Sequence, residues 1–189
     1  MNLSKQEYLR WAEESGKLVI VDTESTGLNG DYNSLLVVSA KPYGKPVVSF
    51  FVTRPGDDRE LTKVAIAFLR QFDVFVAHFG KYHDVPLLIS RNIFHRLPAW
   101  QPRYEIDTWL FAKHNLKLSR NSQAHIARWL GTKEQKMDLG PQEWNDVLSD
   151  PKKNLPTLVA RCESDVKTLE EDYAIMRPYI PDVARRQLV

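Results

Sequence analysis

A short apolar run leads directly into two acidic residues near the start of the chain. Leu18 to Val21 are all apolar, Asp22 and Glu24 follow with one residue between them, and Gly27 comes shortly after. A continuous run of this length is typical of a strand buried on both faces. Because side chains alternate along a strand, Asp22 and Glu24 would project from the same face. Two such carboxylates repel each other unless a cation lies between them, so the segment predicts part of a divalent-metal site.

Length and composition are those of one ordinary globular domain. Of the 189 residues, 43% are hydrophobic and 26% are charged, and we expect residues 1–189 to form a single domain. No apolar stretch is long enough to cross a membrane, and the first residues lack the apolar core of a signal peptide. The single cysteine, Cys162, excludes an internal disulfide and suits a reducing compartment. We therefore expect a cytoplasmic protein, and its small size would suit a bacterial or phage-infected cell.

The net charge is only +2, but the charges are unevenly distributed. Between Lys113 and Lys136 there are six basic residues and one acid, whereas between Arg161 and Asp172 there are five acids and two basic residues. A basic segment beside an acidic centre suits a polyanion held against a metal site. An ordinary solvated helical face explains the same pattern equally well.

Hydrophobic periodicity predicts an α/β protein. The expected strands are residues 17–23, 34–40, 46–52, 73–77 and 104–107. Short turns between the first three favour antiparallel pairing, whereas the later strands alternate with helical segments. A long final helix is expected to carry a core-facing stripe from Leu155 to Met176, with Asp165 at its border. The pattern predicts a mixed sheet covered by helices.

Four acids are candidate metal ligands, and each also has an ordinary explanation. Asp84 could be the N-cap of the helix that follows it. Asp165 could be a surface residue paired with Arg161 or Lys167. An Asp-x-Glu pair occurs often by chance, and only the buried strand before it makes Asp22 and Glu24 informative.

The order and contexts of these acids resemble the DEDD (DnaQ-like) superfamily of 3′–5′ exonucleases, whose members share a ribonuclease H-like fold. The first motif of that family is similar to Val21-Asp-Thr-Glu-Ser-Thr-Gly27, and the second is similar to the segment 76–88 around Asp84. An intermediate segment resembles residues 105–112, and the last motif resembles Arg161-Cys-Glu-Ser-Asp165-Val166. The resemblance implies a mixed five-stranded sheet, three strands antiparallel and then parallel ones, flanked by α-helices.

The resemblance also implies a two-metal 3′–5′ exonuclease that releases nucleoside monophosphates from nucleic acid, with DNA favoured over RNA. Two Mg²⁺ or Mn²⁺ ions about 3.5–4 Å apart would activate water and stabilise the leaving 3′ oxygen. The implied metal ligands are Asp22, Glu24, Asp84 and Asp165. The residues expected to contact the substrate are Thr26, Gly27, Leu28, His78 and Lys136. Nucleic acid is the implied partner, without a membrane, and the oligomeric state is open.

The chain departs from the family pattern beside its last acid. Family members usually place a Tyr four residues, or a His five residues, before that Asp to orient the attacking water. Arg161 and Ala160 occupy those positions here, and an Arg stays protonated at neutral pH. Arg161 could contact the phosphate or pair with Asp165, while His78 or His83 could orient the water or be plain loop residues. Alternatively, the metals alone could suffice at a reduced rate.

This departure leaves two further functions open. One is a catalytically weak or silent nucleic-acid-binding module of the same fold, and the other is a structure-specific endonuclease. Tyr82 could stack on a base, although aromatic residues more often belong to the core, where Trp109 and Trp129 are expected. Asp107 is expected to be structural rather than a metal ligand.

Overall fold

The fold is built on one mixed β-sheet. The computed structural model describes residues 4–54, 56–133, 149–180 and 184–185, together with residues 142, 145 and 146. Five strands match the predicted ones: β1 Leu18–Ser25, β2 Leu35–Pro42, β3 Val48–Phe51, β4 Val74–Ala77 and β5 Tyr104–Asp107. A two-residue strand, β6 Ala184–Arg185, adds an edge that the sequence did not predict.

The strand order is β3-β2-β1-β4-β5-β6. The pairs β1–β2 and β2–β3 are antiparallel, whereas β1–β4 and β4–β5 are parallel. This arrangement confirms the predicted mixed sheet and places β1 at its centre. The pairing of β1 with β2 shifts register between Glu24 and Ser25. The regular ladder is therefore interrupted directly after the two acids, where the chain leaves the sheet.

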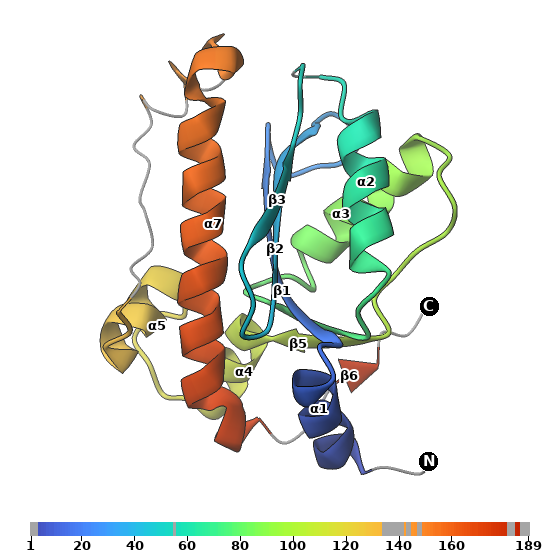
Figure 1. The fold of residues 1–189 in the computed structure, drawn as a ribbon. Coiled ribbons are helices and arrows are strands. Elements are labelled where there is room, and N and C mark those ends of the chain that lie inside the picture. The colour runs from blue at the N-terminus through green and yellow to red at the C-terminus, as the bar shows by residue number, and fades with distance from the viewer. Residues whose placement is uncertain are drawn as a thin grey trace.

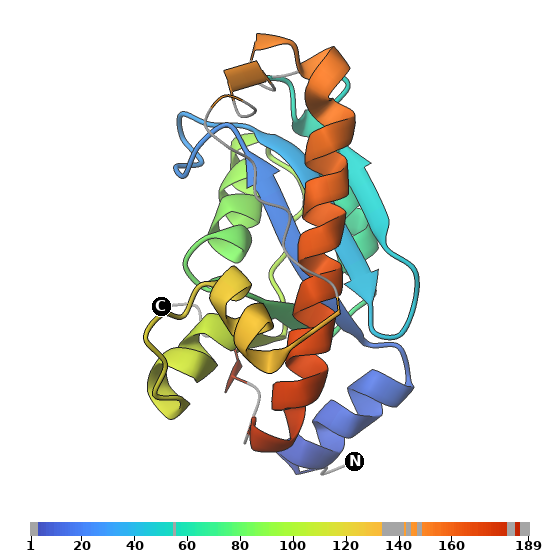
Figure 2. The same cartoon turned by 90° about the vertical axis from the view of Figure 1, so that its left-hand side faces the viewer.

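Helices cover both faces of the sheet. Their bounds are α1 Lys5–Glu14, α2 Arg59–Leu69, α3 Asp84–Phe94, α4 Thr108–Asn115, α5 Gln123–Leu130 and α7 Pro151–Met176, followed by the 3-10 turn η1 Arg177–Tyr179. Figure 1 shows α7 on one face and α2 and α3 on the other. Figure 2 shows α5 beside the lower part of α7. In the described ranges, none of the helices combines the length and the apolarity that a membrane crossing requires.

The helix α7 links two parts of the hydrophobic core. Leu158 and Cys162 pack with the core formed by β1, β2, α2 and α3. Val166, Leu169 and Tyr173 pack with a second core, to which α1, α4 and α5 contribute. This confirms the predicted apolar stripe of the last helix. Because Asp165 is on the same helix between these contacts, it is buried instead of lying at the surface.

A buried ion-pair network, made of Asp58, Arg91 and His95, stabilises the region beside the sheet. Asp58 accepts two hydrogen bonds of 2.8 Å from Arg91 and pairs with His95 Nε2 at 2.6 Å. It also accepts the backbone N–H of Leu35 at 2.8 Å. Arg91 Nη1 in turn donates to the carbonyl of Gly30 at 2.9 Å, so the network fastens α3 to the loop that follows β1.

Candidate metal centre and the adjoining pocket

Three carboxylates meet where α7 crosses β1, and we call them the acid cluster: Asp22, Glu24 and Asp165. Each offers an oxygen, and these oxygens all lie within 4.8 Å of one another. Because side chains alternate along β1, Asp22 and Glu24 project from the same face, as the sequence predicted, and this face points toward α7. Asp165 lies on the buried face of α7 and points toward them. Glu24 and Asp165 are buried, whereas Asp22 is half-buried.

The acid cluster has the donor chemistry of a site for hard cations. Its ligand atoms are all carboxylate oxygens, which Mg²⁺ and Mn²⁺ prefer. Like charges at this separation, in a partly buried setting, repel each other strongly. A divalent cation would relieve that repulsion, so the residues fit the metal that the sequence analysis expected.

Arg161 lies against the acid cluster. Its Nε is 2.9 Å from Glu24 Oε1 and 3.8 Å from Asp165 Oδ2, which is one helical turn further along α7. Arg161 therefore lies near Asp165, the pair considered from the sequence, but it approaches Glu24 more closely. These four side chains together carry three negative charges and one positive charge, so Arg161 offsets only part of the repulsion.

Cys162 supports the acid cluster from the core side, a role that the sequence analysis did not assign. Its thiol donates to Asp22 Oδ2 at 3.2 Å and to the Asp22 carbonyl at 3.4 Å. Burial, together with the charges of Asp22 and Glu24, raises the pKa of this thiol well above its usual value. It therefore keeps its proton and acts as a donor. Cys162 belongs to the predicted apolar stripe of α7, which faces β1, and this position could have predicted its contact with Asp22.

Asp84 lies on the other side of β1 from the acid cluster. Thr23 alternates with the two acids of β1, points toward α3, and donates to Asp84 Oδ1 at 2.7 Å. Burial raises the pKa of Asp84 and outweighs both this hydrogen bond and the charge of His83. Asp84 is the first residue of α3 and the N-cap is His83, so the alternative that Asp84 is only an N-cap is wrong.

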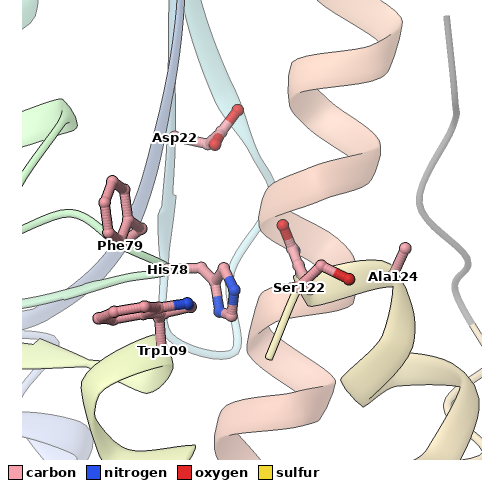
Figure 3. Close-up of a pocket in the computed structure, with 7 residues that line it drawn as sticks. Asp22, His78, Phe79, Trp109, Ser122 and Ala124 are labelled. Carbon is pink, nitrogen blue, oxygen red and sulfur yellow. The ribbon is translucent and has the colours of Figure 1, made fainter. Parts of the chain in front are cut away.

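A cavity of about 640 Å³ opens beside the acid cluster. It is lined by Asp22, His78, Phe79, Trp109, Ser122, Gln123 and Ala124. Figure 3 shows Asp22 at one end, Phe79 and Trp109 along one side, and Ser122 with Ala124 across from them. Its size falls within the range of small-ligand pockets, about 300–1,000 Å³. One carboxylate of the acid cluster, that of Asp22, therefore faces a cavity of small-ligand size.

His78 lines this pocket and also holds the surrounding segments together. Its Nδ1 is 2.9 Å from Thr108 Oγ1, and its Nε2 is 2.9 Å from the carbonyl of Asn121. Because a carbonyl oxygen can only accept, Nε2 carries a proton in this contact. Both ring nitrogens thus take part in the fold, which matches the plain hydrogen-bonding alternative and gives little support to a water-orienting role.

The predicted substrate residues after β1 form an ordered turn. Thr26 Oγ1 accepts the Ser34 N–H at 3.0 Å and lies 3.2 Å from Asn33 Oδ1. A Cβ on Gly27 would come within 2.6 Å of that same oxygen, so a larger residue there would displace the Asn33 side chain from the turn. Leu28 extends into solvent and is 80% exposed. Lys136, the remaining predicted contact, lies outside the described residues.

Two expectations about the tryptophans were wrong. Trp129 is 54% exposed, because the buried face of α5 runs through Gln123, Ile126 and Ala127. Trp109 is half-buried and lines the pocket instead of anchoring the core.

Asp107 has a structural role, since its carboxylate accepts the N–H groups of Trp109 and Leu110 and caps α4.

Comparisons with known proteins agree with this architecture. A family model described as RNase_H superfamily matches residues 19–176. Among the solved structures similar to this chain is the family B DNA polymerase from the hyperthermophilic archaeon Pyrobaculum calidifontis, with a TM-score of 0.72 and 17% sequence identity. That match covers 86% of this chain but only 24% of the polymerase chain, and at this identity it shows the fold alone. A search of curated proteins gives no match.

Proposed function

We propose, from the premise that this chain belongs to the RNase_H superfamily, that it is a two-metal-dependent 3′–5′ exonuclease. It would hydrolyse phosphodiester bonds of nucleic acid and release nucleoside monophosphates, with DNA favoured over RNA. Membership of the superfamily supports a nuclease. The observation that carries the proposal is the acid cluster, whose carboxylate oxygens converge within 4.8 Å beside a pocket of nucleotide size.

We propose that Asp22, Glu24 and Asp165 hold the two Mg²⁺ or Mn²⁺ ions. Asp84 stays a proposed fourth ligand, and it would have to reach the ions from the other side of β1, where Thr23 donates to it. When bound, such ions supply Lewis-acid stabilisation of the charge that develops on the phosphate. Cys162 holds the Asp22 carboxylate through its thiol, and Thr23 holds that of Asp84. The rigid strand β1 and helix α7 set the separation of the ligands, which is the preorganisation that such chemistry needs.

Arg161 is proposed to act within the same site. Its contact with Glu24 fixes that carboxylate and leaves a positive charge where a scissile phosphate would approach the acids. Thr26, Gly27, Leu28 and His78 are proposed to border the terminal nucleotide, and Lys136 to contact the phosphate backbone. The described basic residues between 113 and 133 are exposed, which supports attraction of a polyanion to this side: Lys113, Lys117, Arg120, Arg128 and Lys133.

The test is degradation of 5′-labelled single-stranded and duplex DNA and RNA with Mn²⁺, with Mg²⁺ or with a chelator. We expect a ladder that shortens from the 3′ end and that is lost with the chelator and in Asp22→Asn. Asp172→Asn is the matched control, because Asp172 is also a buried aspartate on α7 but lies outside the acid cluster. Internal cuts on a closed circular substrate would favour an endonuclease instead.

The contact of Arg161 with Glu24 also favours a second candidate function. A guanidinium placed among the acids supplies part of the positive charge that metal ions would bring. A catalytically weak or silent nucleic-acid-binding module could use the same site in that form. Binding of the oligonucleotides without cleavage under any metal condition would support this candidate and overturn the exonuclease.

Two other expectations from the sequence stay predictions. We propose that the chain forms one domain, which the continuous sheet and the shared helix α7 support. We also propose a cytoplasmic location, with which a single, buried and free cysteine, Cys162, is in keeping. Limited proteolysis and cell fractionation are the respective tests.

A further inference from the structure

We infer that Ser39, Ser49 and Glu163 are positioning residues for the acid cluster, because they fix where α7 lies on the sheet. We call these three residues the polar clamp. The inference rests on the proposed function and deepens it, since it specifies what keeps the ligands from β1 and the ligand from α7 at a fixed separation. A strand and a helix that carry ligands for the same ions need such a contact, because each could otherwise shift past the other.

A row of polar side chains lies on the face of the sheet that α7 covers. Asp22 of β1 is paired with Ser39 of β2, and Ser39 is paired with Ser49 of β3. Directly opposed residues of antiparallel strands project from the same face. Because Asp22 belongs to the face that points toward α7, the two serines lie under the same helix.

Hydrogen bonds join both ends of this row to α7. The hydroxyl oxygens of Ser39 and Ser49 are 3.0 Å apart, and Ser49 Oγ donates to Glu163 Oε1 at 2.8 Å. Because Ser49 gives its single hydrogen to a carboxylate, Ser39 donates to Ser49. At the other end, the thiol of Cys162 donates to Asp22 Oδ2 at 3.2 Å. Two consecutive residues of α7 are therefore bonded to the two ends of one row across three strands.

Ser39 is a polar residue in an apolar part of β2. Its exposed fraction is 0%, as are those of Val37, Val38 and Ala40. A buried hydroxyl costs free energy unless it is hydrogen-bonded, so an apolar side chain of similar size would stabilise this position at least as well. The bond to Ser49, and through it to Glu163, therefore accounts for this serine better than core packing does.

The polar clamp meets α7 next to the acid cluster. Glu163 lies two residues after Arg161 and two residues before Asp165, which is less than one helical turn from each. Sliding of α7 along the sheet would change the distances from Asp165 to Asp22 and Glu24. The bond between Ser49 and Glu163 opposes that motion at the point where it would disturb the acid cluster most.

A second contact between α7 and the sheet provides a comparison. Glu170 pairs with Lys41 Nζ and accepts the Gly44 N–H at 2.8 Å, at the turn between β2 and β3. Glu170 lies about two helical turns beyond Glu163. It joins the same helix to the same sheet, but its loss should leave the contact between Cys162 and Asp22 in place.

The experiment uses the thiol of Cys162 to report on its bond to Asp22. The chain has one cysteine, so the S–H stretching band in the infrared spectrum comes from this residue alone. A thiol that donates a stronger hydrogen bond absorbs at a lower wavenumber. Without added metal, the parent protein should therefore absorb at a lower wavenumber than the urea-unfolded chain, since the acceptor in the fold is a carboxylate.

Ser49→Ala and Glu163→Ala should each move the band toward that of the unfolded chain. Each should also raise the dissociation constant for Mn²⁺, measured by calorimetry, about fivefold, the scale of one hydrogen bond. Glu163→Gln should restore the parent band, because an amide oxygen still accepts from Ser49. This rescue separates the hydrogen bond from the charge of Glu163. Glu170→Ala is the matched control, which should lower the melting temperature and leave the band and the Mn²⁺ affinity near those of the parent.

An unchanged band in both alanine variants of the polar clamp would overturn the inference. An equal band shift in Glu170→Ala, a shift that Glu163→Gln does not rescue, or an unchanged Mn²⁺ affinity in both alanine variants would overturn it as well. The failure of the proposed function is a separate result, namely the absence of Mn²⁺ binding and of cleavage by the parent protein. Because the band is recorded without metal, the expected band shifts in such a protein would retain the polar clamp and reject the exonuclease.

Discussion

Two buried carboxylate sites in this protein balance their charges in opposite ways. In the ion-pair network, Asp58 is surrounded by donors from Arg91, His95 and a backbone N–H. In the acid cluster, three carboxylates share one guanidinium from Arg161. The first site matches a negative charge with at least one full positive charge, whereas the second keeps a surplus of negative charge among its four side chains.

The pKa values of Asp58 and of Asp84, which lies outside the acid cluster, show a related contrast. Burial alone would raise the pKa of Asp58, but the hydrogen bonds from Arg91 and His95 outweigh it and hold that pKa below its usual value. Burial raises the pKa of Asp84, where the Thr23 hydroxyl is too weak a donor to compensate. A completed network stabilises the fold, whereas acids without that compensation are typical of a site that binds something else.

The largest expected effect comes from Asp22→Asn. Cleavage should fall by at least about 10³-fold, because one carboxylate of the proposed metal site becomes neutral. In chelator, the melting temperature should stay the same or rise, since one like charge leaves the acid cluster. Initial rates with 5′-labelled DNA and thermal unfolding followed by circular dichroism are the measurements. Residual cleavage within about tenfold of the parent would show that Asp22 is not a ligand.

Asp58→Asn should do the reverse of Asp22→Asn: it should lower the stability strongly and the cleavage rate little. Loss of this charge leaves Arg91 buried and uncompensated, so the free energy of unfolding should fall by about 3–5 kcal/mol. The cleavage rate per folded molecule, measured at low temperature, should change little, because Asp58 contacts none of the proposed ligands. Urea denaturation paired with initial rates tests this. A stability loss below about 1 kcal/mol would remove the contrast between the two sites.

The pH dependence of stability should carry the signature of Asp58. Its pKa in the folded protein is lower than in the unfolded chain, so its stabilisation is present above the ordinary value of about 4 and is lost as the pH falls through the folded pKa. The stability difference between the parent and Asp58→Asn should therefore shrink as the pH falls from 6 to 3. Urea titrations at each pH measure it. A stability difference that stays constant with pH would contradict the assignment of this pH dependence to Asp58.

Arg161→Gln should reduce cleavage much less than Asp22→Asn does. We expect a loss of about tenfold, the scale of one charge-assisted hydrogen bond. The dissociation constant for Mn²⁺, measured by calorimetry, should decrease about threefold, because a positive charge leaves the acid cluster. Arg161→Lys keeps the charge and should leave Mn²⁺ affinity near that of the parent. A loss as large as that of Asp22→Asn would show that Arg161 is indispensable.

The elements of this protein follow from local sequence patterns. The apolar run before Asp22 predicted β1, and the apolar spacing from Leu155 to Met176 predicted α7. The N-cap of α1 is equally local, because the Ser4 side chain accepts the N–H of Glu7 three residues on. These features depend on neighbours within a few residues, so periodicity and capping preferences suffice to predict them. The same alternation placed Asp22 and Glu24 on one face, and the order of the motifs identified Asp165 as their companion.

The sequence by itself determined the five main strands, the long last helix and the identity of the candidate acids. Only the tertiary structure decided which partners those acids meet, namely Thr23 for Asp84, Arg161 for Glu24 and Cys162 for Asp22. It also decided that Phe79 and Trp109 face a pocket and that Asp58 joins Arg91. These contacts join residues far apart in the chain. Their geometry depends on how whole elements pack, because a local pattern specifies a side chain's face but not what lies opposite it.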